Sequence, residues 1–279
     1  MSIIDDAIAA ASLRFVESDS ARLDAELLLC AVLDKPRTYL YTWPDKALSD
    51  DESQQYEALI VRRVAGEPVA HILGARGFWT LDLRVTADTL IPRPETELLV
   101  ETALTHLPES GGRVVDLGTG SGAIALAIAS ECPACEVAAV ERSEAALEVA
   151  RENARRNGLD NVSFHHGSWY QPLAGQRFAL IVSNPPYICA ADPHLQEGDV
   201  RFEPITALAS GADGLDDIRL IIAGAQQHLE PGGWLLLEHG YDQGEAVCAL
   251  LLEAGFEAVD DLPDLQGHGR VAVGRLLRT

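Results

Sequence analysis

The chain has 279 residues, of which 47% are hydrophobic, an ordinary composition for a globular protein. It carries 21 Lys and Arg against 43 Asp and Glu, so its formal net charge is −22. This excess of acid argues against sequence-independent binding of nucleic acid, which depends on neutralising phosphates with Lys and Arg.

The first third of the chain has the pattern of a helical domain. Apolar residues from Ile4 to Phe15 recur at helical spacing, and residues 24–33, "DAELLLCAVL", are strong helix formers. A further helix is expected to begin at the cap residue Ser49 and to stop at Gly66 and Pro68. We therefore predict an N-terminal helical bundle over residues 1–70.

Residues 71–92 show a different period. The stretch "GFWTLDLRVTADTLI" alternates apolar and polar residues, which predicts a β-hairpin connector. The next segment, "IPRPETE", places Pro94 at a plausible first helical position, and Arg93 and Glu95 within it are interpreted as an ion pair.

Residues 93–279 alternate short apolar strands with amphipathic helices, which predicts an α/β domain with a doubly wound, mostly parallel sheet. The last two strands have no helix between them and are expected to form an antiparallel edge. The expected strands are 113–117, 136–140, 162–166, 178–182, 233–239, 256–262 and 270–277.

A glycine-rich turn follows the first of these strands. The stretch "VVDLGTGSGAIALA" places Gly118, Gly120 and Gly122 between a strand and a helix, where a ligand can approach backbone N–H groups. Asp116 is expected to hold loop amides or a ligand ammonium, and Glu141, at the end of the next strand, to grip a ribose diol. Because Gly118, Gly120 and Ala123 also meet the dinucleotide pattern, NAD and S-adenosylmethionine both remain open here.

The stretch "SNPPYI" ends the strand at 178–182. Asn184 is expected to lie beyond that strand, beside the glycine turn, since ligands bind at the carboxyl ends of parallel strands. The Asn184 side chain and the Pro185 carbonyl can accept the hydrogens of a planar NH₂ group, and Tyr187 can cover its face. This arrangement suits methyl transfer to an amide or amino nitrogen by positioning.

The sequence resembles a known family at four stretches: "DLGTGSGAIALAIA", "SNPPYI", "LIPRPETELLVE" and "DVRFEPITALASGADGLDDIR". They are similar to the release-factor glutamine N5-methyltransferases (PrmC or HemK). The resemblance implies a seven-stranded Rossmann-like class I methyltransferase domain and S-adenosylmethionine as cofactor. It implies methylation of the glutamine in the GGQ motif of class 1 peptide chain release factors, with the helical domain helping to dock the substrate protein.

The resemblance also assigns residues. It implies a cofactor site that includes the loop Gly118, Thr119, Gly120, Ser121 and Gly122, with Asp116, Glu141, Trp169 and Asn184. It implies a substrate site of Asn184, Pro185, Pro186 and Tyr187. Two positions depart from the family pattern, since Glu141 replaces a frequent Asp and Ser168 replaces a frequent Asp that would bind adenine N6.

Three other functions compete with this interpretation. An adenine-N6 methyltransferase would use the same Asn-Pro-Pro-Tyr clamp on a flipped base, although the net charge of −22 argues against direct nucleic-acid binding. An NAD-dependent oxidoreductase would use the glycine turn, and a non-catalytic adaptor would use only the helical domain.

The remaining features indicate a cytoplasmic protein. The N-terminus is acidic rather than a signal peptide, and no apolar run reaches the length of about 18 residues that a membrane span requires. The five cysteines, Cys132 and Cys135 among them, are interpreted as reduced thiols, and we expect no metal site.

Overall fold

The computed structural model describes residues 2–277 and divides the chain into two compact units. The first unit comprises the chain up to Ala75 together with the distant segment Gln196–Phe202. The second comprises Arg76–Leu195 and the chain from Glu203 onward. Nothing in the sequence pattern pointed to the separation of Gln196–Phe202 from its neighbours.

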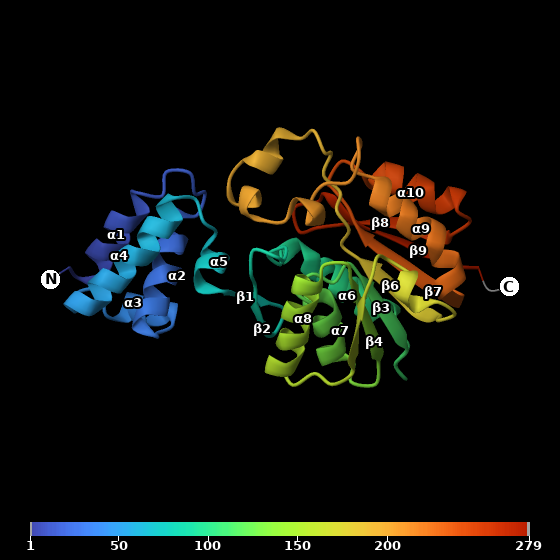
Figure 1. Cartoon of the computed structure of the whole chain (residues 1–279), viewed down its shortest axis with the longest axis horizontal. Helices are drawn as coiled ribbons and strands as arrows, with labels where there is room; N and C mark the ends of the chain where they lie inside the picture. The colour runs from blue at the N-terminus through green and yellow to red at the C-terminus, as the bar shows by residue number, and fades with distance from the viewer. Residues whose placement is uncertain (1, 278–279) are drawn as a thin grey trace. The chain divides into compact units, whose positions relative to one another are not determined.

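The first unit is built from helices around an apolar core (Figure 1). Helix α4 begins at a complete capping box, in which Ser49 and Glu52 satisfy each other's backbone N–H groups. The short helices α3 and α5 were not predicted separately, because six and five residues are too few to show a helical period. The helices are α1 (Ile4–Ser12), α2 (Ala21–Leu33), α3 (Arg37–Thr42), α4 (Asp50–Val64) and α5 (Val69–Leu73).

A buried ion pair joins three segments of this unit. Arg63 of α4 donates to Asp24 of α2 at 2.8 Å and to Asp199 at 2.7 Å. Asp199 begins the 3₁₀ turn Asp199–Phe202, labelled η4, which is how the distant segment is held to the helices. Arg63 and Asp24 are both largely excluded from solvent, so this pair is shielded from water.

The second unit has a central seven-stranded sheet with the strand order β5-β4-β3-β6-β7-β9-β8. Every neighbouring pair is parallel except those that involve β9, which confirms the predicted parallel sheet with an antiparallel edge. The strands are β3 (Arg113–Leu117), β4 (Glu136–Glu141), β5 (Val162–His166), β6 (Phe178–Ser183), β7 (Leu229–Glu238), β8 (Glu257–Pro263) and β9 (Gly269–Arg275).

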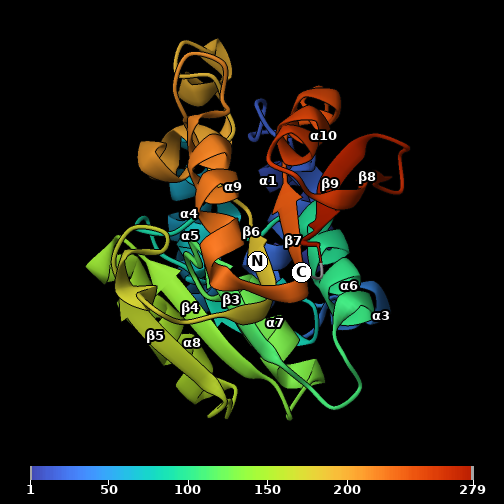
Figure 2. The same ribbon diagram turned by 90° about the vertical axis from the view of Figure 1, so that its right-hand side faces the viewer.

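Helices cover both faces of this sheet (Figure 2). Apolar residues of α6 and α7 share one core cluster with strand residues of one face, and those of α9 and α10 share a second cluster on the other. The helices are α6 (Glu97–His106), α7 (Ala123–Glu131), α8 (Glu144–Arg156), α9 (Asp216–His228) and α10 (Gly244–Glu253). The predicted hairpin is the separate two-stranded sheet of β1 (Ala75–Phe78) and β2 (Leu81–Arg84).

Short 3₁₀ turns occupy the connections. The turn η1 precedes α6, η2 precedes β6, and three more follow β6 before α9 begins. They are η1 (Pro94–Thr96), η2 (Gln171–Leu173), η3 (Pro193–Gln196), η4 and η5 (Ile205–Ala207). Within residues 2–277, no helix has the length and apolar character that crossing a membrane requires.

The interpretation of all five cysteines as reduced thiols is wrong for one pair. Cys132 and Cys135 form a disulfide, with their Cα atoms 5.4 Å apart. The pair spans the turn between α7 and β4, where three residues of separation bring the two side chains within bonding range. The thiols of Cys30, Cys189 and Cys248 are free.

Candidate active site

The glycine turn connects β3 to α7 and adopts a conformation that other residues rarely reach. Gly118, Gly120 and Gly122 have φ angles of 78°, 55° and 89°. The N–H groups of Gly118 and Thr119 donate to the carbonyl of Val140, at 2.9 and 3.0 Å, which ties the turn to β4. Positive φ at three alternate positions explains why the sequence uses glycine there.

Asp116 lies beneath this turn and is completely buried. Its Oδ2 accepts hydrogen bonds from the Thr119 hydroxyl at 2.6 Å and from the N–H of Ala125 at 3.2 Å, while Oδ1 has no partner in the described part of the chain. Burial raises the pKa of Asp116 to about 7, against the two hydrogen bonds that lower it. Of the two roles expected for Asp116, the structure supports holding the turn.

Glu141 ends β4 and faces the same turn. Its Oε2 accepts from the N–H of Gly120 at 3.0 Å, and its Oε1 accepts from the N–H of Ser143 at 2.8 Å. A carboxylate has about four lone-pair positions, so each oxygen can still accept a further hydrogen bond. The carboxylate is therefore fixed in place and still able to bind a hydroxyl pair.

Trp169 lies over the glycine turn from the loop after β5. A Cβ atom added to Gly118 would stand 3.3 Å from the Trp169 ring, so the ring covers Gly118 closely. Trp169 has a φ of 49°, which is unusual for a non-glycine residue and marks a strained position. Trp169 and Ser168 both line the pocket described below.

Asn184 follows directly after β6, the neighbour of β3 in the sheet. Ser183 donates to the carbonyl of Leu117 at 2.6 Å, which links the two strand ends. The Asn184 Nδ2 donates to the Thr96 hydroxyl at 3.2 Å. The carbonyl of Tyr187 accepts from Gln243 at 2.9 Å, and burial raises the pKa of the Tyr187 hydroxyl above its usual range.

The "IPRPETE" segment contacts the loop that follows Asn184 in the chain. Arg93 forms an ion pair with the buried Glu203, not with Glu95, so the predicted pairing within the segment is wrong. Glu203 also accepts from the N–H of Ile91 at 2.9 Å. Glu203, 110 residues further along the chain, is therefore the partner of Arg93. Glu203 is buried beside the guanidinium, whereas Glu95 is exposed to solvent.

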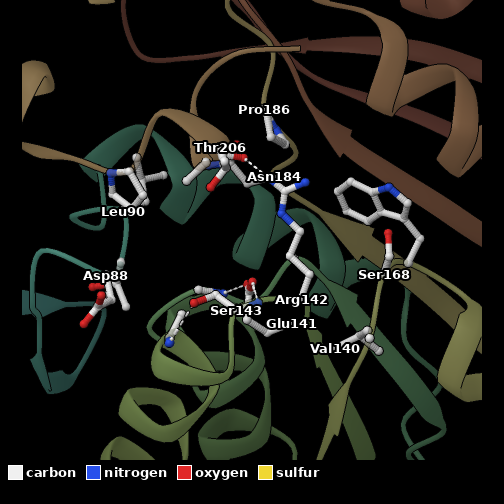
Figure 3. Close-up of a pocket in the computed structure, with 18 of the residues that line it drawn as sticks. Asp88, Leu90, Val140, Glu141, Arg142, Ser143, Ser168, Asn184, Pro186 and Thr206 are labelled. Carbon is white, nitrogen blue, oxygen red and sulfur yellow. Dashed lines mark hydrogen bonds between the residues drawn. The ribbon is translucent and has the colours of Figure 1, made fainter. Parts of the chain in front are cut away.

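These features surround one pocket at the carboxyl ends of the strands. Figure 3 shows Glu141, Ser168 and Asn184 around it, with Arg142 reaching across to the carbonyl of Thr206 at 2.9 Å. The predicted residues that line it are Gly118, Gly120, Glu141, Ser168, Trp169, Asn184 and Pro186. The other predicted residues do not line it: Asp116, Thr119, Ser121, Gly122, Pro185 and Tyr187.

Two family models match the chain. One, described as the PrmC N-terminal domain, matches residues 6–74, and another, the methyltransferase small domain, matches residues 94–197. A release factor glutamine methyltransferase from Xylella fastidiosa is 56% identical over 91% of this chain and 93% of its own length. The protein of the same name from Escherichia coli K12 is 50% identical over 92% of this chain and 93% of its own.

The chain belongs to the release factor glutamine methyltransferase family.

A solved structure supports the fold of this family member. A methyltransferase from Pyrococcus furiosus superposes with a TM-score of 0.55 at 21% identity, covering 79% of this chain and 98% of its own. At that identity the likeness concerns the fold alone. It agrees with a seven-stranded, Rossmann-like methyltransferase sheet, as the sequence predicted.

Part of the pocket wall of this methyltransferase is formed by residues that the sequence did not single out. Residues just after the β1–β2 hairpin and residues around η5 contribute to it, as do neighbours of Glu141. The clearest examples are Asp88, Leu90, Arg142, Pro204 and Thr206. Leu90, Pro204 and Thr206 lie within stretches that carried the family resemblance, which was the available signal, whereas Asp88 and Arg142 show no chemical pattern along the chain.

Proposed function

We propose that this protein transfers a methyl group from S-adenosylmethionine to the side-chain amide nitrogen N5 of the glutamine in the GGQ motif of class 1 peptide chain release factors. One observation carries the proposal. Asn184 and Pro186 line the same pocket as Gly118 and Glu141, so an NH₂-binding motif adjoins a nucleoside-binding turn. The 50–56% identity with curated family members over nearly the whole chain supports it.

The cofactor fits the residues that are present. The backbone of the glycine turn permits close approach of a ligand, and both Glu141 oxygens have lone pairs left for the ribose hydroxyls. The Trp169 ring offers a flat apolar surface beside Gly118 for the adenine. Ser168 lines the pocket in place of a carboxylate, so any hydrogen bond it makes to adenine is weaker. When bound, S-adenosylmethionine supplies an electrophilic methyl group.

The chain's own residues position the substrate amide. An amide nitrogen is a poor nucleophile because its lone pair is delocalised into the carbonyl. We expect the Asn184 Oδ1 and the Pro185 carbonyl to accept its two hydrogens, which directs the nitrogen lone pair toward the methyl carbon. Tyr187, whose hydroxyl stays protonated through its raised pKa, serves as a surface and not as a base. The alkylated nitrogen is acidic and loses its proton after transfer.

The remaining parts of the chain fit a protein substrate. We assign the helical unit a role in docking the release factor, and we expect the protein to work in the cytoplasm. The chain's net charge of −22 favours this substrate over the nucleic acid that an adenine-N6 methyltransferase would bind.

Mass spectrometry tests the proposal. The full-length protein is incubated with S-adenosylmethionine and a class 1 release factor, and the tryptic GGQ peptide is examined for one added methyl group on glutamine. A parallel reaction contains labelled cofactor and total RNA or DNA. Methylation of the GGQ glutamine is expected, whereas label in nucleic acid alone would overturn the proposal.

A further inference from the structure

Three polar side chains meet behind the pocket. They are Thr96, at the start of α6, Asn184, after β6, and Glu238, the last residue of β7. Glu238 and Thr96 are 2% and 4% exposed, so two of the three side chains in this cluster are buried. Asn184 alone reaches the pocket (Figure 3).

The sheet itself brings Glu238 to Asn184. Ser183, the last residue of β6, is paired in register with Leu237 of β7, which brings the residues that follow them, Asn184 and Glu238, to the same end of the sheet. The Asn184 amide and the Thr96 hydroxyl both lie close enough to the Glu238 carboxyl to lower its pKa, against the larger effect of its burial. Asn184 Nδ2 also donates to the Thr96 oxygen at 3.2 Å.

The Thr96 hydroxyl serves this cluster and not its own helix. Thr96 occupies the N-cap position of α6, where a threonine side chain commonly accepts a backbone N–H, yet it makes no such hydrogen bond. Its oxygen accepts from Asn184, which leaves its own hydrogen for Glu238. A helix-capping role therefore does not account for the hydroxyl.

The direction of these hydrogen bonds follows from the chemistry of the carboxylate. The Asn184 NH₂ group already donates to the Thr96 oxygen, and above its pKa of about 7 the Glu238 carboxylate only accepts, so the Asn184 atom that faces it is the NH₂ group. The Asn184 Oδ1 is then left for the pocket. The reverse orientation would present an NH₂ group to the NH₂ group of a substrate amide, and neither could accept.

We propose that Thr96 and Glu238 are positioning residues that fix which way round the Asn184 amide sits, so that its oxygen faces the substrate amide. This inference rests on the proposed function for its kinetic effect, but the orientation of Asn184 is a property of the enzyme alone. Among residues 2–277 the Glu238 Oε2 has no hydrogen-bond partner, and Arg270 and Glu95 are charged neighbours that act on this carboxyl. Within residues 2–277, Glu238 forms no salt bridge that would explain its burial as a contribution to folding stability.

Matched variants test the proposal. Thr96→Val removes the hydroxyl and keeps the shape of the side chain, Thr96→Ser keeps the hydroxyl, and Glu238→Gln adds a donor where only acceptance is allowed. Thr96→Val and Glu238→Gln should lower kcat for release-factor methylation by about tenfold or more, because a reacting group loses its orientation. Thr96→Ser should stay within about threefold of the unchanged protein, as should KM for the release factor in all three variants.

Two kinetic results would overturn the proposal. One is a Thr96→Val variant that keeps at least a third or so of the original kcat. The other is an equal loss in Thr96→Val and Thr96→Ser, which would assign the effect to packing. Calorimetric binding of S-adenosylmethionine and the melting temperature establish that each variant is folded.

A second measurement does not depend on the release factor. In protein labelled with ¹⁵N-asparagine, the Asn184 side-chain NH₂ pair is identified by its absence in Asn184→Ala. Thr96→Val and Glu238→Gln should shift this pair and speed its exchange with solvent, while Thr96→Ser should leave it in place. An unchanged pair in Thr96→Val would overturn the proposal. If the unmodified enzyme did not methylate a release factor, only the proposed function would fail. The NMR signals of the Asn184 NH₂ group would still test whether Thr96 and Glu238 orient this amide.

Discussion

The two ends of the Asn184 side-chain amide have different surroundings. Its nitrogen is engaged by Thr96 within the protein, and its other edge borders the pocket that Gly118 and Glu141 also line. The two prolines that follow have fixed φ angles and no N–H, so the backbone beyond Asn184 has little freedom to move its side chain away. A single, partly exposed asparagine thus joins the internal polar cluster to the surface where substrate is expected.

Replacing Asn184 by Ala should lower kcat for methylation of a release factor by about a hundredfold or more, since the acceptor that orients the substrate amide is lost. The measurement is single-turnover methylation with excess enzyme. Asn157→Ala, an asparagine at the end of α8 and outside the pocket, is the matched control and should keep full activity. Near-normal turnover in Asn184→Ala would contradict the assigned role.

Two fully buried acids make stability depend on pH. Burial raises the pKa of Glu238 and of Asp116 to about 7 in the folded protein, from 4.5 and 3.8. The charges and hydroxyls that act on Glu238 come from η1 (Glu95, Thr96), from β9 (Arg270) and from Asn184. Because the folded state holds these protons more tightly, their contribution to stability is complete below about pH 4 and is lost as pH rises to about 7.

Glu238→Gln should therefore flatten this dependence. The free energy of unfolding of the unchanged protein should fall between pH 5 and pH 8, and the variant should lose on the order of 2 kcal/mol less over that range. Urea denaturation at the two pH values measures the difference. Parallel curves for the two proteins would mean that Glu238 does not titrate in this window.

Among the elements, the turn between β3 and α7 is the one that most narrowly restricts which residues the sequence can use. Gly118 needs a positive φ and also lies close beneath the Trp169 ring. Gly158, after α8, also has a positive φ, but a Cβ atom added there would have no neighbour within 4 Å among the described residues. Replacing either glycine by alanine would force a side chain into a left-handed backbone conformation. Only at Gly118 would the new methyl group also meet another side chain.

Gly118→Ala should weaken S-adenosylmethionine binding by about tenfold or more, because the new methyl group displaces Trp169 and narrows the ligand's approach. Gly158→Ala should destabilise the protein by about 1 kcal/mol through the same left-handed backbone and leave cofactor affinity unchanged. Isothermal titration calorimetry with both variants separates the effects. Equal affinities would show that Trp169 is not part of the cofactor site.

At the scale of the whole molecule, the first unit includes a short segment whose neighbours along the chain belong to the second unit. Gln196–Phe202 belongs to this unit through Asp199 and Arg63, although residues on both sides of it belong to the second. Arg63 also neutralises the buried Asp24, so one guanidinium holds α2, α4 and η4 together.

Arg63→Ala should destabilise the first unit by about 3 kcal/mol, because it leaves Asp24 buried without a counter-charge. Its neighbour Arg62 pairs with Glu67 at the surface, so Arg62→Ala should cost less than about 1 kcal/mol. Chemical denaturation measures the loss in the free energy of unfolding. Hydrogen exchange of residues 196–202 measures whether this segment is released from the helices. Similar losses in the two variants would contradict a buried, structural role for Arg63.

The sequence by itself determined the features that are written locally along the chain. Alternating strands and helices, the glycine turn, the hairpin and the Asn-Pro-Pro-Tyr stretch each follow from residues close together, since period and backbone preference act over a few positions. Adjacent parallel strands then place Asn184 beside the glycine turn, as expected.

Only the tertiary structure decided which distant side chains meet. Thr96 and Asn184 are 88 residues apart and Arg93 and Glu203 are 110 apart, and Glu238 reaches Asn184 through strand register. No local pattern encodes these partners, because each contact depends on which loops and strand ends are buried together. For the same reason Arg63 finds Asp199 across 136 residues, and a piece of the second half of the chain folds with the first unit.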